Sequence, residues 1–218
     1  MLDPWLRPVK ERLLVPFARM LGGRVHPVTV TVTAFLVGMA AAVFAARATY
    51  GLALGCWIVN RLLDGFDGTL ARWQHAQSDL GGYVDLLLDF VVYAAIPVGL
   101  VLGVPGATRE TVALAALALI ATFYINAASW MYLAALLEKR GAGARARGEL
   151  TSVAMPEGLV GGTETVVFYT LFFLWPAHLV TLFLVMAGLV VVTIVLRLIW
   201  AVRYFGSAGR GEDKARQQ

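Results

Sequence analysis

Long apolar runs separated by short polar segments make up most of this chain. A helix that crosses a lipid bilayer needs about 20 largely apolar residues, and runs of this kind recur from residue 28 onward. The second and the fifth run border directly on polar residues, so their boundaries are the least well defined. The pattern predicts six membrane-spanning helices, at 28–46, 51–63, 80–104, 111–137, 159–175 and 179–202.

The two ends of the chain differ from the apolar runs between them. The first 25 residues mix large apolar side chains with basic ones, which is typical of an amphipathic helix lying in the membrane interface. Pro8 and Pro16 interrupt this segment, so a charged leader without such a helix is the alternative. We therefore expect an all-α integral membrane protein with an N-terminal interfacial amphipathic helix. Its parts would be a juxtamembrane segment (1–25), a six-helix transmembrane domain (26–204) and a polar C-terminal tail (205–218).

Composition supports a membrane protein and argues against a soluble domain. Hydrophobic residues make up 59% of the chain and charged residues only 15%, whereas soluble domains have about 45–50% and about 25%. The mean hydropathy is +0.73. A formal net charge of +4 also occurs in proteins that bind nucleic acid. In a membrane protein, however, basic loops on the cytoplasmic side are the commoner cause, and no nucleic-acid partner is expected.

Lysine and arginine gather at alternate ends of the predicted helices. Thirteen of the eighteen lie before the first run, after the fourth or after the sixth. The segments after the first and the third run hold one each, Arg47 and Arg109. Because cytoplasmic loops carry the excess of basic residues, this pattern places both termini in the cytoplasm. The segment that joins the second and third runs then faces the cytoplasm as well.

That cytoplasmic segment concentrates carboxylates. Residues three or four apart share one face of a helix, so two acidic faces can meet where the chain turns at 73–78. Clustered carboxylates repel one another, and hard divalent cations such as Mg²⁺, Mn²⁺ or Ca²⁺ compensate them best. Five of the seven aspartates of the protein lie here: Asp64, Asp67, Asp79, Asp85 and Asp89.

Small residues and one arginine accompany the acids. Gly68, Ala71 and Gly81 would let a ligand approach the backbone, and the guanidinium of Arg72 suits phosphate oxygens. Carboxylates, small residues and an arginine together describe a pyrophosphate site better than an ion pathway, because intramembrane acids in transporters usually occur singly or in pairs. A divalent-cation transporter is the distant alternative.

The stretch from Asp64 to Asp89 reads D-x2-D-G-x2-A-R-x8-G-x3-D-x3-D. This pattern resembles the signature of the CDP-alcohol phosphotransferases, also called CDP-alcohol phosphatidyltransferases, with every fixed position and spacing met. The resemblance implies that two divalent ions, Mg²⁺ or Mn²⁺, are held by Asp64, Asp67, Asp85 and Asp89. It implies that Asp89 is also the base that deprotonates the attacking hydroxyl. It further implies that the CDP group is bound by Asp67, Gly68, Ala71, Arg72 and Gly81.

An enzyme of this kind would work in phospholipid synthesis. The expected reaction moves a phosphatidyl group from CDP-diacylglycerol to a small alcohol and releases CMP. One alternative within the family moves a phospho-amino-alcohol from a CDP-alcohol to diacylglycerol. Another uses a phosphorylated acceptor such as inositol phosphate. The resemblance also implies a homodimer embedded in membrane lipid.

The acceptor is the least defined part of the reaction. Family members with phosphorylated acceptors often carry an arginine pair at the start of the fifth span, where this chain has Gly162 and Thr165. Their absence favours an unphosphorylated polyol or amino alcohol. Glu164 and Arg197 are charged residues within the fifth and sixth runs, where charge is costly, and we expect them to contact the acceptor. The alternative for Glu164 is an acid stabilised by the dipole at the start of a helix. Arg197 has two alternatives, a lipid phosphate or the membrane surface.

Overall fold

The computed structural model describes residues 14–16, 18–20, 22–143 and 158–216 of the 218. Within these residues the regular structure is helical, as the all-α prediction requires. A short 3₁₀ helix, η1 (Gly22–Arg24), precedes the longer helices, and another, η2 (Pro176–His178), lies between the last two. The longer helices are α2 (Pro27–Ala46), α3 (Tyr50–Trp73), α4 (Asp79–Gly103), α5 (Gly106–Lys139), α6 (Gly162–Leu174) and α7 (Leu179–Arg216).

Each of these longer helices coincides with one of the predicted spans. Four stretches are long and apolar enough to cross a membrane, namely α2, α4, α5 and Pro176–Gly206, which comprises η2 and most of α7. The helix α6 has 13 residues and is therefore about 20 Å long, shorter than the ~30 Å hydrocarbon core. The helix α3 ends in the acidic motif. Four spans are thus supported by length and composition, and spanning by α3 and α6 stays a prediction.

The sequence pattern predicts an interfacial helix at the N-terminus and a polar tail at the C-terminus. The predicted interfacial helix falls mostly on residues outside the described part, which begins at residue 14. At the other end, α7 does not stop at the start of the polar tail but continues to Arg216.

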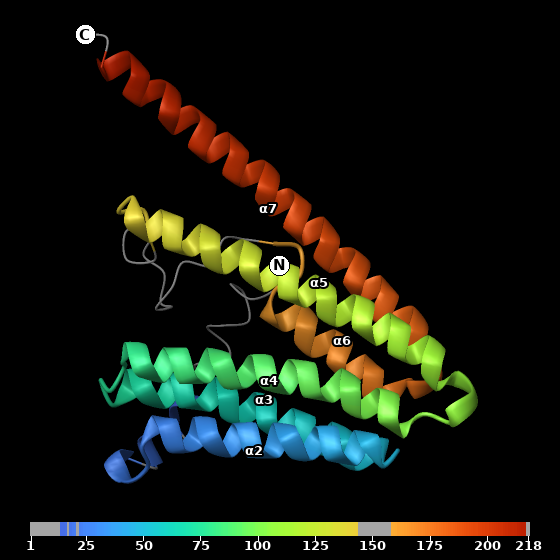
Figure 1. The fold of residues 1–218 in the computed structure, drawn as a ribbon. Helices are drawn as coiled ribbons and strands as arrows, with labels where there is room; N and C mark the ends of the chain where they lie inside the picture. The colour runs from blue at the N-terminus through green and yellow to red at the C-terminus, as the bar shows by residue number, and fades with distance from the viewer. Residues whose placement is uncertain (1–13, 17, 21, 144–157, 217–218) are drawn as a thin grey trace.

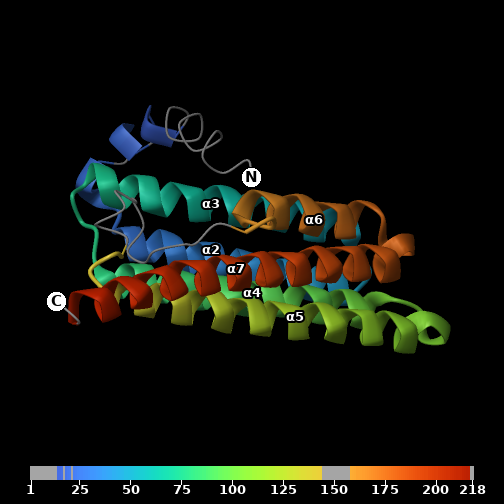
Figure 2. The same ribbon diagram turned by 90° about the horizontal axis from the view of Figure 1, so that it is seen from above.

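The helices form two groups joined by a short one. The helix α2 packs against both α3 and α4, while α5 packs along α7 (Figure 1). The short helix α6 contacts α3 and α7 and so connects the groups; Figure 1 shows it between them, and in Figure 2 it overlaps part of α3 and lies beside α7. The ends of α3 and α4 that carry the motif lie at the same end of the first group.

Close approach of α2 and α4 depends on two glycines. A Cβ atom at Gly99 would overlap the carbonyl oxygen of Ala42, and one at Gly103 would overlap that of Ala45. Small residues spaced by four let helix backbones touch in a membrane, where packing rather than water exclusion drives association. This contact fixes how α4 presents its acidic turns to α3.

Replacing Gly99 by alanine is expected to destabilise the protein by about 1–3 kcal/mol, because the added methyl group pushes α4 off α2. The measurement is thermal unfolding in a mild detergent. The matched control is Gly188→Ala in α7, where an added Cβ meets no atom within 4 Å. Equal melting temperatures for the two variants would contradict this account of the packing.

Aromatic side chains fill the core between the two groups. The rings of Trp57 on α3 and Tyr169 on α6 stack with centroids 5.2 Å apart, and Tyr93 on α4 meets Tyr169 edge-on at 5.3 Å. The hydroxyl of Tyr169 donates a hydrogen bond of 2.7 Å to the backbone oxygen of Tyr93. This cluster ties together the helices that carry the two halves of the acidic motif.

Candidate active site

The chain reverses between the two halves of the motif, as the sequence predicts. The helix α3 ends at Trp73, and His75 adopts a left-handed backbone conformation with φ 52° in the turn. Ser78 then caps α4: its hydroxyl accepts a 3.0 Å hydrogen bond from the N–H of Gly81, the usual role of a serine at this position. The turn thereby sets the acidic ends of α3 and α4 side by side.

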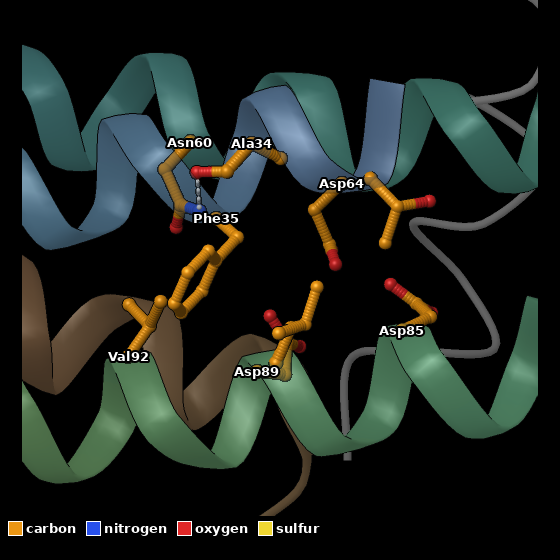
Figure 3. A pocket seen from close by; sticks show the side chains of 9 residues that line it. Ala34, Phe35, Asn60, Asp64, Asp85, Asp89 and Val92 are labelled. Atoms are coloured by element: carbon orange, nitrogen blue, oxygen red, sulfur yellow. Dashed lines mark hydrogen bonds between the residues drawn. The ribbon is translucent and has the colours of Figure 1, made fainter. Parts of the chain in front are cut away.

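Three of the four motif aspartates line one small cavity. Asp64 on α3 and Asp85 and Asp89 on α4 face one another across the gap between these helices (Figure 3). The cavity has a volume of about 10 Å³, which is room for a single water molecule or a bare cation. Residues of α2, among them Thr31 and Phe35, complete its wall.

The fourth aspartate is directed toward α2. Asp67 is buried, with 5% of its surface exposed. Its Oδ2 accepts a 2.7 Å hydrogen bond from the hydroxyl of Thr31. The hydroxyl of Thr31 thus compensates part of the cost of burying this carboxylate. Sequence reasoning missed Thr31, and the alternation of valine and threonine at 28–33 carries no local signal that could have revealed it.

A cation lies directly beside the acids. The guanidinium of Arg61, one turn before Asp64 on α3, binds both carboxylate oxygens of Asp89 at 2.6 and 3.2 Å. It also lies 3.7 Å from Asp64. Sequence reasoning did not assign Arg61 to the site, although its spacing of three from Asp64 was a usable signal.

Other motif residues lie on the same two helices, in turns next to the aspartates. The Nη1 atom of Arg72 lies 3.4 Å from the place where a Cβ of Gly68 would be, and its Nη2 donates a 3.3 Å hydrogen bond to Thr69. An open backbone at Gly68 therefore leaves room for the arginine. Gly81 lies in the first turn of α4, at the capped end.

Glu164 and Arg197, the two predicted acceptor residues, lie on other helices and do not line this cavity. The carboxylate of Glu164 accepts a 3.0 Å hydrogen bond from the N–H of Gly161 at the start of α6. This cap bond gives Glu164 a structural role of its own. Arg197 lies on α7, and its Nη1 donates a 2.8 Å hydrogen bond to the side-chain oxygen of Asn126 on α5.

The side chains that line the cavity offer the type of ligand atom, carboxylate oxygen, that a hard divalent cation prefers. Three carboxylates from two helices line a cavity of ionic size, and oxygen donors of this type suit Mg²⁺ or Mn²⁺. In the described part of the chain, no three acidic, histidine or cysteine side chains are arranged closely enough to hold an ion as they stand. The cation that now holds Asp89 is the guanidinium of Arg61.

Comparison with known sequences places this chain in a family. The profile described as CDP-alcohol phosphatidyltransferase matches residues 24–202. The inner membrane protein YnjF of Escherichia coli is 36% identical over 178 residues, which cover 81% of this chain and 84% of that protein. The bifunctional IPC transferase and DIPP synthase of Thermococcus kodakarensis is 30% identical over 210 residues, 90% of this chain but 44% of the longer protein.

Solved structures share the fold. Phosphatidylinositol phosphate synthase of Mycobacterium tuberculosis with CDP-DAG bound has a TM-score of 0.65 at 21% identity, covering 86% of this chain and 92% of that one. The same enzyme with manganese and citrate has a TM-score of 0.63, covering 84% and 86%. Because the family profile spans most of the chain, the resemblance seen in the motif is confirmed, and the protein belongs to the CDP-alcohol phosphatidyltransferase family.

Proposed function

We propose that this protein is a metal-dependent transferase that moves a phosphatidyl group from CDP-diacylglycerol to a small alcohol and releases CMP. The observation that carries the proposal is the convergence of Asp64, Asp85 and Asp89 on one cavity, within a motif that keeps every fixed position. The solved relative with CDP-DAG bound shares the fold, which supports this donor.

The four motif aspartates would hold two divalent ions, Mg²⁺ or Mn²⁺, at the cytoplasmic end of α3 and α4. When bound, such ions neutralise the diphosphate and stabilise the entering and leaving oxygens of a phosphoryl transfer. Asp64 and Asp85 already point into the shared cavity (Figure 3). Asp67 would reach the same ions from its position against Thr31.

Asp89 would act as the general base. Its carboxylate takes the proton of the acceptor hydroxyl, and the hydroxyl oxygen forms a bond to the phosphorus that carries diacylglycerol. The bond from this phosphorus to the bridging oxygen breaks, and its electron pair leaves with CMP. Arg72 would donate to phosphate oxygens, while Gly68, Ala71 and Gly81 keep the backbone open to the CDP group.

Two acceptor classes follow from different observations. The missing arginine pair at Gly162 and Thr165 favours an unphosphorylated polyol or amino alcohol.

Arg197 favours a phosphorylated acceptor as the second candidate. It is 5% exposed, its Nε has no hydrogen-bond partner, and within the described residues no carboxylate pairs with it. A buried cation of this kind is costly without an anion, and a phosphate would satisfy it. A role for Glu164 toward the acceptor stays a prediction.

Purified enzyme with Mg²⁺ is expected to release CMP from CDP-diacylglycerol only when a small alcohol is present, and to form the matching phospholipid. The assay supplies acceptors in pairs, inositol with inositol 1-phosphate and glycerol with glycerol 3-phosphate, and resolves the labelled lipids. We expect the unphosphorylated member to react, since the arginine pair is missing.

If only inositol 1-phosphate or glycerol 3-phosphate gave a lipid product, the acceptor would be a phosphorylated alcohol and the proposal of an unphosphorylated one would be wrong. CMP release only from a CDP-amino-alcohol with diacylglycerol would show the reverse direction of transfer. Metal flux into vesicles without any nucleotide turnover would contradict the enzyme assignment. The cytoplasmic position of the site and of both termini, and a homodimeric state, belong to the same proposal.

A further inference from the structure

Arg61 is the cation nearest to the proposed general base. Its Nη2 donates to Oδ1 of Asp89 at 2.6 Å and its Nη1 donates to Oδ2 at 3.2 Å. This two-bonded geometry is the strong, directional form of an arginine–carboxylate pair. It defines the orientation of the Asp89 carboxylate, which a single bond would leave free to rotate.

The guanidinium is itself held from several sides. Its Nε donates to the side-chain oxygen of Asn60 at 2.8 Å, and its Nη1 donates to the hydroxyl of Tyr93 at 2.8 Å. It lies over the rings of Trp57 and Tyr93, with 4.8 and 5.1 Å to the centroids. With 9% of the side chain exposed, Arg61 is a fixed part of the core.

The residues around Arg61 are in turn anchored to other helices. The side-chain nitrogen of Asn60 donates to the backbone oxygen of Ala34 on α2 (Figure 3). Tyr169 on α6 holds Tyr93 by a hydrogen bond to its backbone oxygen. The position of Arg61 therefore depends on α2, α4 and α6 as well as on its own helix, and a ligand at the cavity would meet a prearranged cation.

We propose that Arg61 is a positioning residue that orients Asp89 for proton transfer and whose positive charge weakens the binding of divalent cations to the cluster. The inference rests on the metal site of the proposed function. A carboxylate has about four lone-pair sites, so the two bonds to Arg61 leave others for an ion and for the acceptor hydroxyl. The same charge stabilises the clustered acids when no ion is bound, and it repels an ion at short range.

Two substitutions separate the charge of Arg61 from its geometry. Arg61→Gln removes both the positive charge and the two hydrogen bonds to Asp89. Arg61→Lys keeps a positive charge, on an ammonium group, but loses the planar guanidinium that makes both bonds at once. Mn²⁺ binding is measured by electron paramagnetic resonance titration in detergent, without substrate. Turnover is measured separately with CDP-diacylglycerol and the acceptor found above.

We expect Arg61→Gln to bind Mn²⁺ about tenfold more tightly than the wild type, because a nearby positive charge is gone. Arg61→Lys should bind Mn²⁺ within about twofold of the wild type. Both variants should lose about 100-fold in kcat, since Asp89 is no longer held in one orientation. A purely structural role would lower stability without tightening Mn²⁺ binding.

The control is Arg203→Gln, which removes an exposed arginine from α7 and should leave Mn²⁺ affinity and turnover unchanged. Unchanged or weaker Mn²⁺ binding in Arg61→Gln would overturn the role of the charge. Wild-type turnover in Arg61→Lys would overturn the role of the fork, and this variant remains decisive if Arg61→Gln does not fold. Because Mn²⁺ binding is read without substrate, it tests the role of the charge independently of turnover. Absence of any transferase activity would count against the proposed function and, with it, against the orienting role of Arg61, but not against the effect of its charge on Mn²⁺ binding.

Discussion

Replacing Asp89 by asparagine is expected to lower turnover about a thousandfold or more while the protein stays folded in detergent. The amide cannot accept the proton of the acceptor hydroxyl, and general-base catalysis alone contributes about 10²–10⁴-fold. The substitution also removes a charged partner of Arg61, to which Asp89 is bound at 2.6 Å, and a ligand of the proposed ions. The measurement is release of CMP in single-turnover and steady-state assays.

Asp79→Asn is the matched control for this substitution. Asp79 lies on the same helix, in its first turn, but is exposed and does not occupy a fixed position of the motif. Its loss should leave turnover near the wild-type value. Thermal unfolding of both variants checks that the fold survives. Substantial residual activity in Asp89→Asn, at more than a tenth of the wild-type rate, would contradict the role of Asp89 as base.

Removing divalent cations is expected to reduce turnover below detection, and Mg²⁺ or Mn²⁺ should restore it. Asp64, Asp85 and Asp89 line one cavity beside the guanidinium of Arg61, and a diphosphate would add further negative charge there. Without an ion, this repulsion opposes both donor binding and departure of CMP. The measurement is CMP release in excess EDTA, followed by titration with each metal.

The control for chelation is EDTA already saturated with Mg²⁺, which should leave the rate unchanged. Restoration by Zn²⁺ in place of Mg²⁺ or Mn²⁺ would contradict the assignment of a hard cation to an all-oxygen site. An undiminished rate in excess chelator would remove metal ions from the proposed mechanism altogether.

Local sequence patterns were sufficient to predict the helices and the acidic motif. Apolar runs predicted all of the longer helices, because the cost of exposing backbone polar groups to lipid leaves helix as the only local solution. The spacings of the aspartates predicted two acidic helix faces, since residues three or four apart share a face. The turn after Trp73 and the start of α4 at Asp79 agree with the predicted return at 73–78.

The length of the helix in the fifth apolar run was harder to predict from the sequence. The run at 159–175 is apolar through most of its length, yet α6 begins only at Gly162 and ends at Leu174. The glycines at its start and Pro176 after its end limit the helix. Apolar composition alone does not show where such breaks shorten a helix.

Local patterns were enough to establish that the chain is helical and apolar, and which carboxylates belong to one motif, because helical periodicity and lipid solubility are local properties. The partner of each acid, in contrast, follows from how the helices pack. Asp67 meets a threonine 36 residues away, and Asp89 meets an arginine 28 residues away. These pairings depend on the rotation and separation of packed helices, which the glycine contacts between α2 and α4 and the aromatic core set jointly, and no segment of the chain encodes them alone.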